Sequence, residues 1–324
     1  MIKKNKLNIL IDGQFGSTGK GVIASYLSRF NFDVAVTNSG ANSGHTFYMN
    51  GKKCITQHLP VSGIMKDCII YLCADSVINP AILLNEIQRF KISPDRLVIH
   101  PRAAIITSDM IEGERNADSL NKICSTFSGT GKAIISKTNR EGNLACNEVA
   151  LERFIGVIDL QKTTSLMEVP QGLGLSINSG LSYPYCTSRE ITIPSAMAAA
   201  QVHPHFLGTV FSVIRTFPIR VSNAYSVLGN EMANSGPFYE DSIEKTWDEL
   251  NLTPELTTVT NKRRRIATFS YIQYQEMVRI LRPDYIFLNF SNYLNEVSLN
   301  SLLDNLPEVT HLCSGPNADD VSCI

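Results

Sequence analysis

Short apolar runs alternate with stretches of helical periodicity along the first hundred residues. The apolar runs have the length and β-branched content of buried strands, and they lie at 8–11, 34–37, 69–73 and 97–100. Helical patterns separate them at 20–30 and at 80–90, where a proline stands in the first turn. This repeated order of strand, helix and strand predicts a parallel sheet with crossover helices.

The same alternation continues to the C-terminus. We expect further helices at 195–200, 242–250 and 270–281, and further strands at 285–288 and 310–313. No internal repeat or low-complexity linker divides the chain, although a segment at about 125–168 is richer in polar and turn residues. The sequence therefore predicts one α/β domain, 1–324, with a mainly parallel central sheet, a P-loop-like start of strand, loop and helix, and a helical subdomain inserted at about 125–168.

Composition and charge narrow the class of protein. Hydrophobic residues make up 44% of the 324 residues and charged residues 18%, a balance that excludes a disordered or coiled-coil chain. Because 29 Lys and Arg face 30 Asp and Glu, the net charge of -1 offers no basic field for nucleic acid, whereas a small phosphorylated ligand stays open. No apolar run suits a signal segment or a membrane span, so we expect a cytoplasmic protein without a membrane partner.

A glycine-rich segment after the first strand candidate carries the clearest chemical signal. In the run 9–21 an apolar strand leads into a glycine-rich turn, and Lys20 stands where a helix begins. The backbone N–H groups of such a turn, the helix N-terminus and the lysine together suit a polyphosphate. The run departs from a Walker A loop, because Gln14 replaces the first glycine and Gly21 follows the lysine. An ordinary glycine-rich turn remains an alternative at this point.

A second polar loop, 38–46, follows the second strand candidate. It contains two glycines, two asparagines and His45. Ligands collect in loops at the carboxyl edge of a parallel sheet. His45 is therefore a candidate acid, and a structural histidine is the alternative interpretation.

Together these two loops resemble the signatures of adenylosuccinate synthetases. The segment 14–21 is similar to their Gln-Trp-Gly-Asp-Glu-Gly-Lys-Gly, and 42–46 is similar to their Asn-Ala-Gly-His-Thr. Further family motifs follow in the same order along most of the chain, at 57–64, 128–132, 170–172, 183–188, 220–221, 262–265 and 314–316. The shared order makes the resemblance specific, because no single motif would be.

The resemblance implies an enzyme that replaces a purine 6-oxo oxygen with the amino group of L-aspartate, using a nucleoside triphosphate and Mg²⁺. In the family, O6 is first phosphorylated and the aspartate amine then displaces phosphate. The resemblance implies catalytic roles at the positions of Ser17, Lys20 and His45, and contacts to Mg²⁺ at Ser17 and Gly44. It also implies a homodimer in which an arginine of the partner subunit completes the phosphate site, and Arg140 is the candidate.

The resemblance further assigns three binding sets. The triphosphate set is Ser17, Thr18, Gly19, Lys20, Gly21, Gly44, His45, Thr46, Arg264, Asn289, Ser291, Ser314, Gly315 and Pro316. The acceptor-nucleotide set is Ser17, Asn42, Thr130, Gln171, Thr187, Arg140 and Val221. The aspartate set is Thr258, Thr260, Lys262, Arg263 and Arg264, on a run that without the family motif would be a solvated basic surface.

One departure from the family motif bears on the acceptor. Ser17 stands where the family has an aspartate that acts as base and magnesium ligand, and such a group contributes roughly two to four powers of ten in rate. A shorter serine makes room for the 2-amino group of guanine. We therefore expect dGMP as acceptor, as in the phage-type branch that makes the precursor of 2-aminoadenine for modified DNA. Two alternatives stay open: a synthetase acting on IMP with Asp12 as replacement base, and an inactive nucleotide-binding switch.

A second departure bears on the donor. The family reads the guanine of GTP with the aspartate of Thr-Lys-Leu-Asp, whereas here the strand candidate at 285–288 is followed by Asn289-Phe-Ser-Asn292, without a carboxylate. Asn289 or Ser291 could instead meet adenine, so we expect ATP or dATP as donor. If the chain is phage-encoded, the expected cytoplasm is that of the host.

Overall fold

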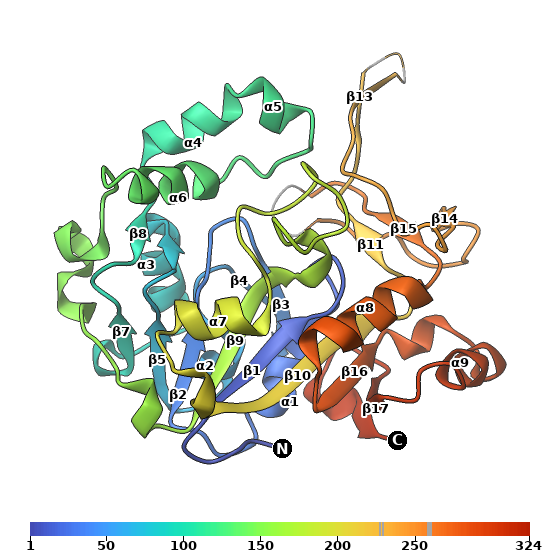
Figure 1. Ribbon diagram of the computed structural model, residues 1–324, viewed down its shortest axis with the longest axis horizontal. Coiled ribbons are helices and arrows are strands. Elements are labelled where there is room, and N and C mark those ends of the chain that lie inside the picture. Colours follow the sequence, from blue (N-terminus) through green and yellow to red (C-terminus); the bar gives the residue numbers. More distant parts are fainter. Residues whose placement is uncertain (227, 229, 258–260) are drawn as a thin grey trace.

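A twisted sheet forms the centre of the computed structural model, which describes residues 1–226, 228, 230–257 and 261–324 (Figure 1). Its strands are β1 (Leu7–Asp12), β2 (Val34–Thr37), β5 (Ile69–Leu72), β7 (Leu97–Ile99), β9 (Ser165–Gly172), β10 (Leu207–Arg215), β16 (Tyr285–Asn289), β17 (Val309–Cys313) and β18 (Val321–Cys323). Within the described ranges their order is β18-β17-β16-β10-β1-β9-β2-β5-β7, and β18 alone pairs antiparallel. The predicted mainly parallel α/β sheet is confirmed.

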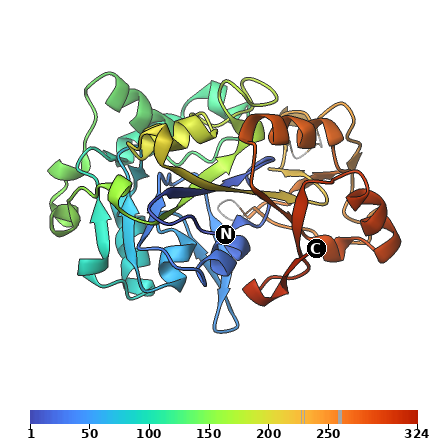
Figure 2. The same ribbon diagram turned by 60° about the horizontal axis from the view of Figure 1, so that its bottom comes forward.

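Helices cover both faces of this sheet (Figure 2). They include α1 (Lys20–Leu27) and α2 (Val61–Met65) on one face, and α7 (Ile193–Ala199) and α8 (Tyr271–Leu281) on the other. Because side chains alternate along a strand, Leu7 and Ile9 of β1 pack with α7 and α8, whereas Leu10 packs with α1. Strands buried on both faces explain the nearly continuous apolar runs of the sequence.

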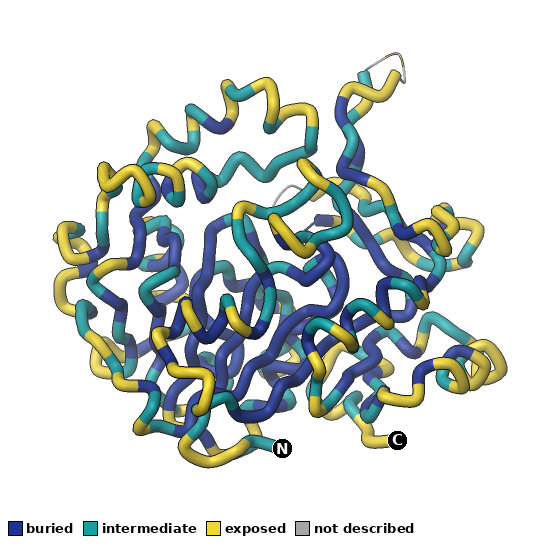
Figure 3. Tube along the Cα trace, viewed as in Figure 1, coloured by how far each residue is buried: buried dark blue, intermediate teal, exposed yellow. Residues whose placement is uncertain are grey.

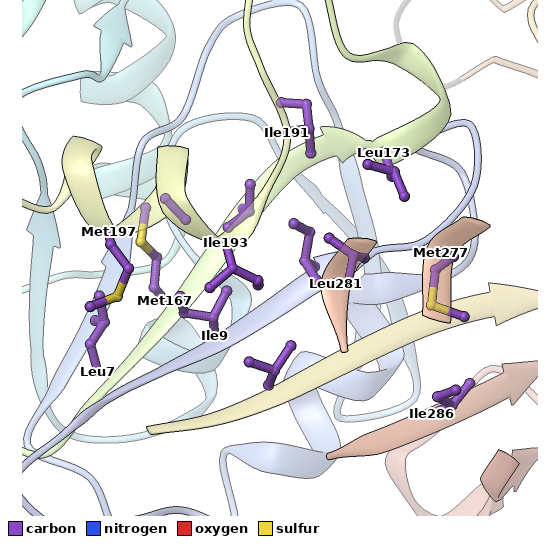
Figure 4. Packing of buried hydrophobic residues seen from close by; sticks show 14 of the residues in the cluster. Leu7, Ile9, Met167, Leu173, Ile191, Ile193, Met197, Met277, Leu281 and Ile286 are labelled. Carbon is purple, nitrogen blue, oxygen red and sulfur yellow. The ribbon is translucent and has the colours of Figure 1, made fainter. Parts of the chain in front are cut away.

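The larger buried cluster lies between the sheet and the pair α7 and α8 (Figure 4). Met197 of α7 and Met277 and Leu281 of α8 belong to this cluster together with Ile9 and Met167 from the central strands. The burial colours follow the same layers: the central strands are dark blue and the outer helices and loops carry the yellow, exposed positions (Figure 3). This core holds the carboxyl ends of the central strands in fixed register.

Smaller elements surround the sheet. They are the hairpin β3 (His45–Met49) and β4 (Lys52–Thr56), the pair β6 (Val77–Ile78) and β8 (Ala104–Ile105), the three strands β11 (Ile219–Arg220), β15 (Arg265–Ala267) and β14 (Glu244–Lys245), the pair β12 (Ala224–Tyr225) and β13 (Glu231–Ala233), and the helices α3 (Pro80–Arg89), α4 (Ser108–Arg115), α5 (Asp118–Asn121), α6 (Thr130–Thr138) and α9 (Glu296–Leu303). The β12–β13 arm projects away from the body in Figure 1. No helix in the described part of the chain is both long and apolar enough to cross a membrane.

The predicted helix at 242–250 is wrong. Glu244 and Lys245 instead form β14, which pairs antiparallel with β15, and a turn follows. Trp247 is buried there and donates its indole N–H to the Arg264 carbonyl at 2.7 Å. Cross-strand pairing and the burial of this one large side chain override a helical pattern that is weak by itself.

The segment predicted as an insertion, 125–168, contains α6 and three short 3-10 helices at 145–147, 149–154 and 160–162. Its last four residues, 165–168, lie in β9 between β1 and β2. β9 was not expected from the pattern, because Glu168 and Pro170 interrupt its apolar run. Glu168 is accommodated in the interior because Ser62 donates both its N–H and its hydroxyl to one carboxylate oxygen.

Candidate active site

A cavity of about 630 Å³ lies at the carboxyl ends of β1, β2 and β9. Nine of the residues predicted for the site line it, namely Ser17, Asn42, Gly44, His45, Thr130, Gln171, Thr187, Val221 and Arg264. They come from loops that are distant in sequence and that the parallel sheet brings to one edge, as expected for an open α/β fold.

The loop that follows β1, 13–19, is held by the carboxylate at the end of that strand. Asp12 is fully buried, and one of its oxygens accepts hydrogen bonds from the N–H groups of Gln14 (2.8 Å) and Gly16 (3.1 Å). The other oxygen accepts from the N–H and the hydroxyl of Thr18. Burial raises the pKa of Asp12, and these hydrogen bonds oppose the shift. Asp12 therefore shapes the loop, and the engagement of both its oxygens there speaks against the role of replacement base.

Glycines allow this loop to turn and to approach its neighbours. Gly16 and Gly19 adopt φ angles of 85° and 81°, a left-handed region that other residues rarely enter. A Cβ on Gly21 would lie 2.2 Å from the Thr46 carbonyl oxygen, so this glycine lets α1 pack directly on β3. The helix begins at Lys20, and its N-terminal N–H groups point toward the loop.

Lys20 and His45 meet across this contact. The Nζ of Lys20 lies 3.4 Å from Nδ1 of His45, the first residue of β3. Burial, reinforced by the charge of Lys20, lowers the pKa of His45 well below its usual 6.5. Burial also lowers the pKa of Lys20, while Glu168 and Asp12 oppose that shift. A neutral imidazole that accepts from the ammonium at Nδ1 keeps an N–H donor at Nε2.

Two arginines converge on Ser17. Arg264 donates from Nη1 to the Ser17 hydroxyl at 2.8 Å, and Arg215 donates from Nη1 to the Ser17 carbonyl at 2.9 Å. Arg215 is 1% exposed and forms an ion pair with Glu255 at 2.5 Å. The sequence reasoning missed Arg215 and Glu255, although an arginine that ends an apolar run at a carboxyl edge was an available signal.

The predicted aspartate set is divided by the structure. Arg264 faces the cavity, whereas Arg263 lies on the surface with its guanidinium 3.7 Å from Asp248. Lys262 is exposed, and its backbone N–H donates to the Thr257 hydroxyl at 2.8 Å. The other two predicted members, Thr258 and Thr260, lie outside the described residues.

The last cation of the run belongs to the framework. Arg265 is the first residue of β15, and it forms two hydrogen bonds with the carboxylate of Glu244. It also donates from Nη1 to the carbonyl of Gly236 at 2.7 Å. Arg265 therefore joins β14, β15 and the base of the β12–β13 arm.

A buried carboxylate stands at the wall next to Thr130. Glu114 accepts hydrogen bonds from the N–H groups of Gly129 (2.7 Å) and Gly131 (2.9 Å), and so caps the first turn of α6. Thr130 forms a hydrogen bond with the hydroxyl of Ser128 at 2.9 Å. Arg140, the candidate from the partner subunit, is exposed just after α6 and does not line this cavity.

The residues predicted near the donor base lie behind the phosphate loop. The Nδ2 of Asn289 donates to the Thr18 carbonyl at 2.7 Å, and the hydroxyl of Ser291 donates to the Cys313 carbonyl at 3.1 Å. Both side chains are buried, and among the described residues the Oδ1 of Asn289 has no hydrogen-bond partner. The segment 314–316 follows β17 at the surface, and it does not line the cavity.

The protein groups near Ser17 that could bind a metal ion fit only one kind of magnesium site. Among the described residues, no group of three or more His, Cys, Asp or Glu side chains could hold a metal ion. Ser17 and Gly44 line the cavity and can offer a hydroxyl and a carbonyl oxygen. Since Mg²⁺ commonly binds through substrate phosphates with few protein ligands, these residues fit an ion that arrives with a triphosphate.

The fold and this site define a member of the adenylosuccinate synthetase family. The family model described as adenylosuccinate synthetase matches residues 9–158 and 145–299. The chain therefore belongs to this family, which confirms the resemblance of its motifs, and it is an enzyme of the carbon–nitrogen ligase class.

Enzymes from phages are among the relatives that match nearly the whole chain. The N6-succino-2-amino-2'-deoxyadenylate synthases of Salmonella phage PMBT28 and Vibrio phage phiVC8 are 34% and 33% identical to this chain; the matches cover 96% and 97% of it and 92% and 97% of the relatives. Among solved structures, the succinoaminodeoxyadenylate synthetase of Cyanophage S-2L, bound to dGMP and to dATP as an energy donor, has a TM-score of 0.88 and 33% identity, over 100% of this chain and 96% of that one. The adenylosuccinate synthetase of Plasmodium falciparum shares the fold, with a TM-score of 0.81 at 19% identity over 99% and 100% of the two chains.

Proposed function

We propose that this chain joins L-aspartate to C6 of dGMP, with ATP or dATP as phosphoryl donor, and produces N6-succino-2-amino-2'-deoxyadenylate. The observation that carries the proposal is the serine at position 17, at the cavity end of the phosphate loop. The proposal is supported by relatives with that activity in their names, which match nearly the whole chain. It is further supported by the bound dGMP and dATP of the similar cyanophage enzyme.

Ser17 favours guanine for two physical reasons. Its side chain is shorter than the aspartate of the family motif, which leaves space beside the purine where guanine carries its 2-amino group. Its hydroxyl is also neutral, so the guanidinium of Arg264, which touches it, has no carboxylate there to neutralise it. Arg264 thus stays available to an anionic substrate.

The proposed reaction has two steps. O6 of dGMP attacks the γ-phosphorus of the donor as N1 loses its proton to solvent, and the nucleoside diphosphate leaves. The amine of aspartate then attacks C6 and releases a proton. The C6–O6 bond breaks, and O6 leaves as part of the phosphate. The Nε2–H of His45 donates to the oxygen between C6 and phosphorus, and Lys20 compensates the negative charge of the transferring group.

Phosphate binding follows from the same residues. The N–H groups at the start of α1 and the ammonium of Lys20 face the donor phosphates. Mg²⁺, held by the donor phosphates with Ser17 and Gly44 nearby, would supply further neutralisation of phosphate charge. Asn289, whose Oδ1 has no hydrogen-bond partner among the described residues, Ser291 and the segment 314–316 are the contacts proposed for adenine.

A homodimer would complete the acceptor site. Arg140 is exposed just beyond α6 and does not line the cavity of its own subunit. In this proposal the partner's copy of this arginine binds the 5'-phosphate of dGMP beside Thr130 and Thr187. Gln171 and Asn42, whose carbonyl accepts from the Gln171 amide at 3.5 Å, contact the nucleotide from the opposite wall.

One assay tests the proposal and both alternatives. The protein is incubated with aspartate, Mg²⁺ and dATP, with dGMP or IMP as acceptor, and the succinylated products are separated by mass. We expect product from dGMP in clear excess. Product from IMP alone would identify an ordinary adenylosuccinate synthetase, and no product from either would favour the inactive switch.

Ser17→Asp sharpens the result. We expect this change to reduce kcat/KM for dGMP more than for IMP, because the carboxylate takes the space of the 2-amino group and pairs with Arg264. A loss of about 10-fold to 200-fold would correspond to the 1–3 kcal/mol that such a pocket contact contributes. Ser17→Ala is the matched control, since it removes the hydroxyl without adding bulk or charge. An equal effect of Ser17→Asp on both acceptors would contradict the assigned role.

A further inference from the structure

A buried ion pair between Arg215 and Glu255 connects the phosphate loop with the segment that carries Arg264. Arg215 ends β10, and its backbone N–H donates to the side chain of Gln14 at 3.0 Å, while its guanidinium donates to the Ser17 carbonyl. The same guanidinium forms two hydrogen bonds with the carboxylate of Glu255, at 2.5 and 3.3 Å. With 1% of Arg215 exposed, this side chain does not touch a substrate in the cavity.

Glu255 also connects this ion pair to Arg264, the arginine that lines the cavity. The carbonyl of Glu255 accepts a hydrogen bond from the backbone N–H of Arg264 at 2.9 Å. Its carboxylate also accepts from the hydroxyl of Tyr293 at 3.0 Å, so three groups hold one short segment. The position of Arg264 relative to Ser17 thus depends on a glutamate that the phosphate-loop side holds through Arg215.

The segment that follows β16, predicted to lie near the donor base, also contacts the guanidinium of Arg215. The guanidinium carbon of Arg215 lies 4.0 Å from the centre of the Phe290 ring, a stacked cation–π contact. Phe290 in turn lies against the phosphate loop, because a Cβ on Gly19 would be 3.2 Å from its ring. Arg215 therefore contacts the phosphate loop directly through Ser17 and indirectly through Phe290.

The ion pair of Arg215 and Glu255 also affects the charge around Arg264. Arg215 and Glu255 neutralise each other, and over the described residues no carboxylate forms an ion pair with Arg264 within 4.0 Å. Arg264 instead donates to the neutral oxygens of Ser17 and Leu256. If Arg215 did not hold Glu255, this carboxylate would be free to pair with Arg264 and to compete with an incoming carboxylate.

We infer that Arg215 and Glu255 are positioning residues that hold Arg264 against the phosphate loop and keep its guanidinium available for the dicarboxylate substrate. The inference rests on the proposed function, since it deepens the aspartate site of that reaction. It predicts a specific kinetic signature: weakening the pair raises KM for aspartate much more than KM for dGMP. Ser17 is the dGMP contact bonded to Arg215, through its backbone carbonyl, whereas Thr130, Thr187 and Asn42 do not bond to the pair.

The test compares two glutamates that each bind an arginine through two hydrogen bonds. Glu255→Gln weakens the pair with Arg215, and Glu244→Gln weakens the matched pair with Arg265, which lies outside the cavity. We expect Glu255→Gln to raise KM for aspartate at least about tenfold, as misplacement of a binding group by about 1 Å can cost 10²-fold. Glu244→Gln should change it less than about threefold, within the range of an exposed pair. KM for dGMP should change less than about threefold in both variants.

A milder variant is included in case Glu255→Gln fails to fold. Tyr293→Phe removes one hydrogen bond to Glu255 without changing any charge, and it should raise KM for aspartate in the same direction by a smaller factor. Thermal melting of each variant is recorded beside the kinetics. Equal aspartate KM values for Glu255→Gln and Glu244→Gln, or a parallel rise for aspartate and dGMP, would overturn the inference.

The wild-type chain separates this inference from the proposed function. An inactive wild type in the same assay would refute the function. Calorimetric titration of aspartate into the protein with dGMP and dATP analogues measures the positioning role without turnover. Weaker aspartate binding in Glu255→Gln than in Glu244→Gln supports the pair in that case, and equal binding rejects it.

Discussion

The phosphate loop and the arginine run present two ways in which a short motif becomes a site. In the loop 13–19, consecutive residues act together: Asp12 binds their N–H groups, and α1 begins where the loop ends. In the run 262–265, consecutive cations separate. Arg264 contacts the phosphate loop, Arg265 binds Glu244, and Lys262 is exposed.

The difference lies in what directs the side chains. A glycine-rich loop between a strand and a helix binds through its own backbone, so its chemistry follows from local sequence. Side chains in extended chain alternate in direction, so the neighbours Arg264 and Arg265 face opposite sides. Which side becomes functional depends on partners that lie far away in sequence. A backbone site is thus readable from its motif, whereas a side-chain site needs the fold.

The largest expected effect concerns the loop side. His45→Ala should lower kcat by roughly two to four powers of ten, since it removes the donor beside Lys20. Folding should be retained, because His45 is only partly buried and its place in β3 is held by backbone pairing with β4. Steady-state kinetics with dGMP and a thermal melt provide the two measurements. Turnover within threefold of the wild type would show that the loop works without this histidine.

The next effect separates the two neighbouring arginines. Arg264→Ala should raise KM for aspartate by about 10-fold to 100-fold, in keeping with a charged hydrogen bond of about 1.5–3 kcal/mol. Arg265→Ala should instead lower the free energy of unfolding by about 1–3 kcal/mol, because it leaves Glu244 and the Gly236 carbonyl without their donor. Urea unfolding and aspartate kinetics are measured on both variants. The comparison fails if the two substitutions give the same pair of effects.

Much of the framework was predictable from local patterns. β2 begins and ends where its apolar run does, and α3 begins at the expected proline, because both depend on periodicity and turn chemistry within a few residues. β9 and the segment 242–250 were not predictable in this way. Glu168 is accommodated in a central strand because Ser62 donates two hydrogen bonds to one of its carboxylate oxygens, and β14 forms because β15 is available as a partner.

The candidate site likewise contains some residues that local sequence predicts and others whose contacts depend on the fold. His45 and Lys20 were predictable from their loops, and the structure brings them together. The contact between Arg264 and Ser17 spans 247 positions, and the bond from Arg215 to the same serine spans 198. No local pattern encodes such pairs. Asn289 adds a contact that its motif does not indicate, since its Nδ2 donates to the Thr18 carbonyl.

The smallest effect tests whether the loop side is more sensitive to pH than the arginine side. The pKa of His45 is lowered in the folded state, so between that value and 6.5 the unfolded chain binds a proton that the folded chain does not. Stability contributed by the neutral imidazole is complete above pH 6.5 and declines as the pH falls below it. Arg264, with a pKa of about 10, keeps its charge over this range.

We therefore expect the wild type to lose unfolding free energy from pH 7 to pH 5 more steeply than His45→Asn, by up to about 1.4 kcal/mol per pH unit, the limit for one proton. His58, whose pKa burial lowers to about 3, contributes equally to both proteins and cancels in the difference. Urea unfolding at pH 7, 6 and 5 gives the two slopes. Parallel slopes would mean that His45 is as easily protonated in the folded chain as in the unfolded one. The ammonium of Lys20, 3.4 Å away, would then face a second cation instead of an acceptor.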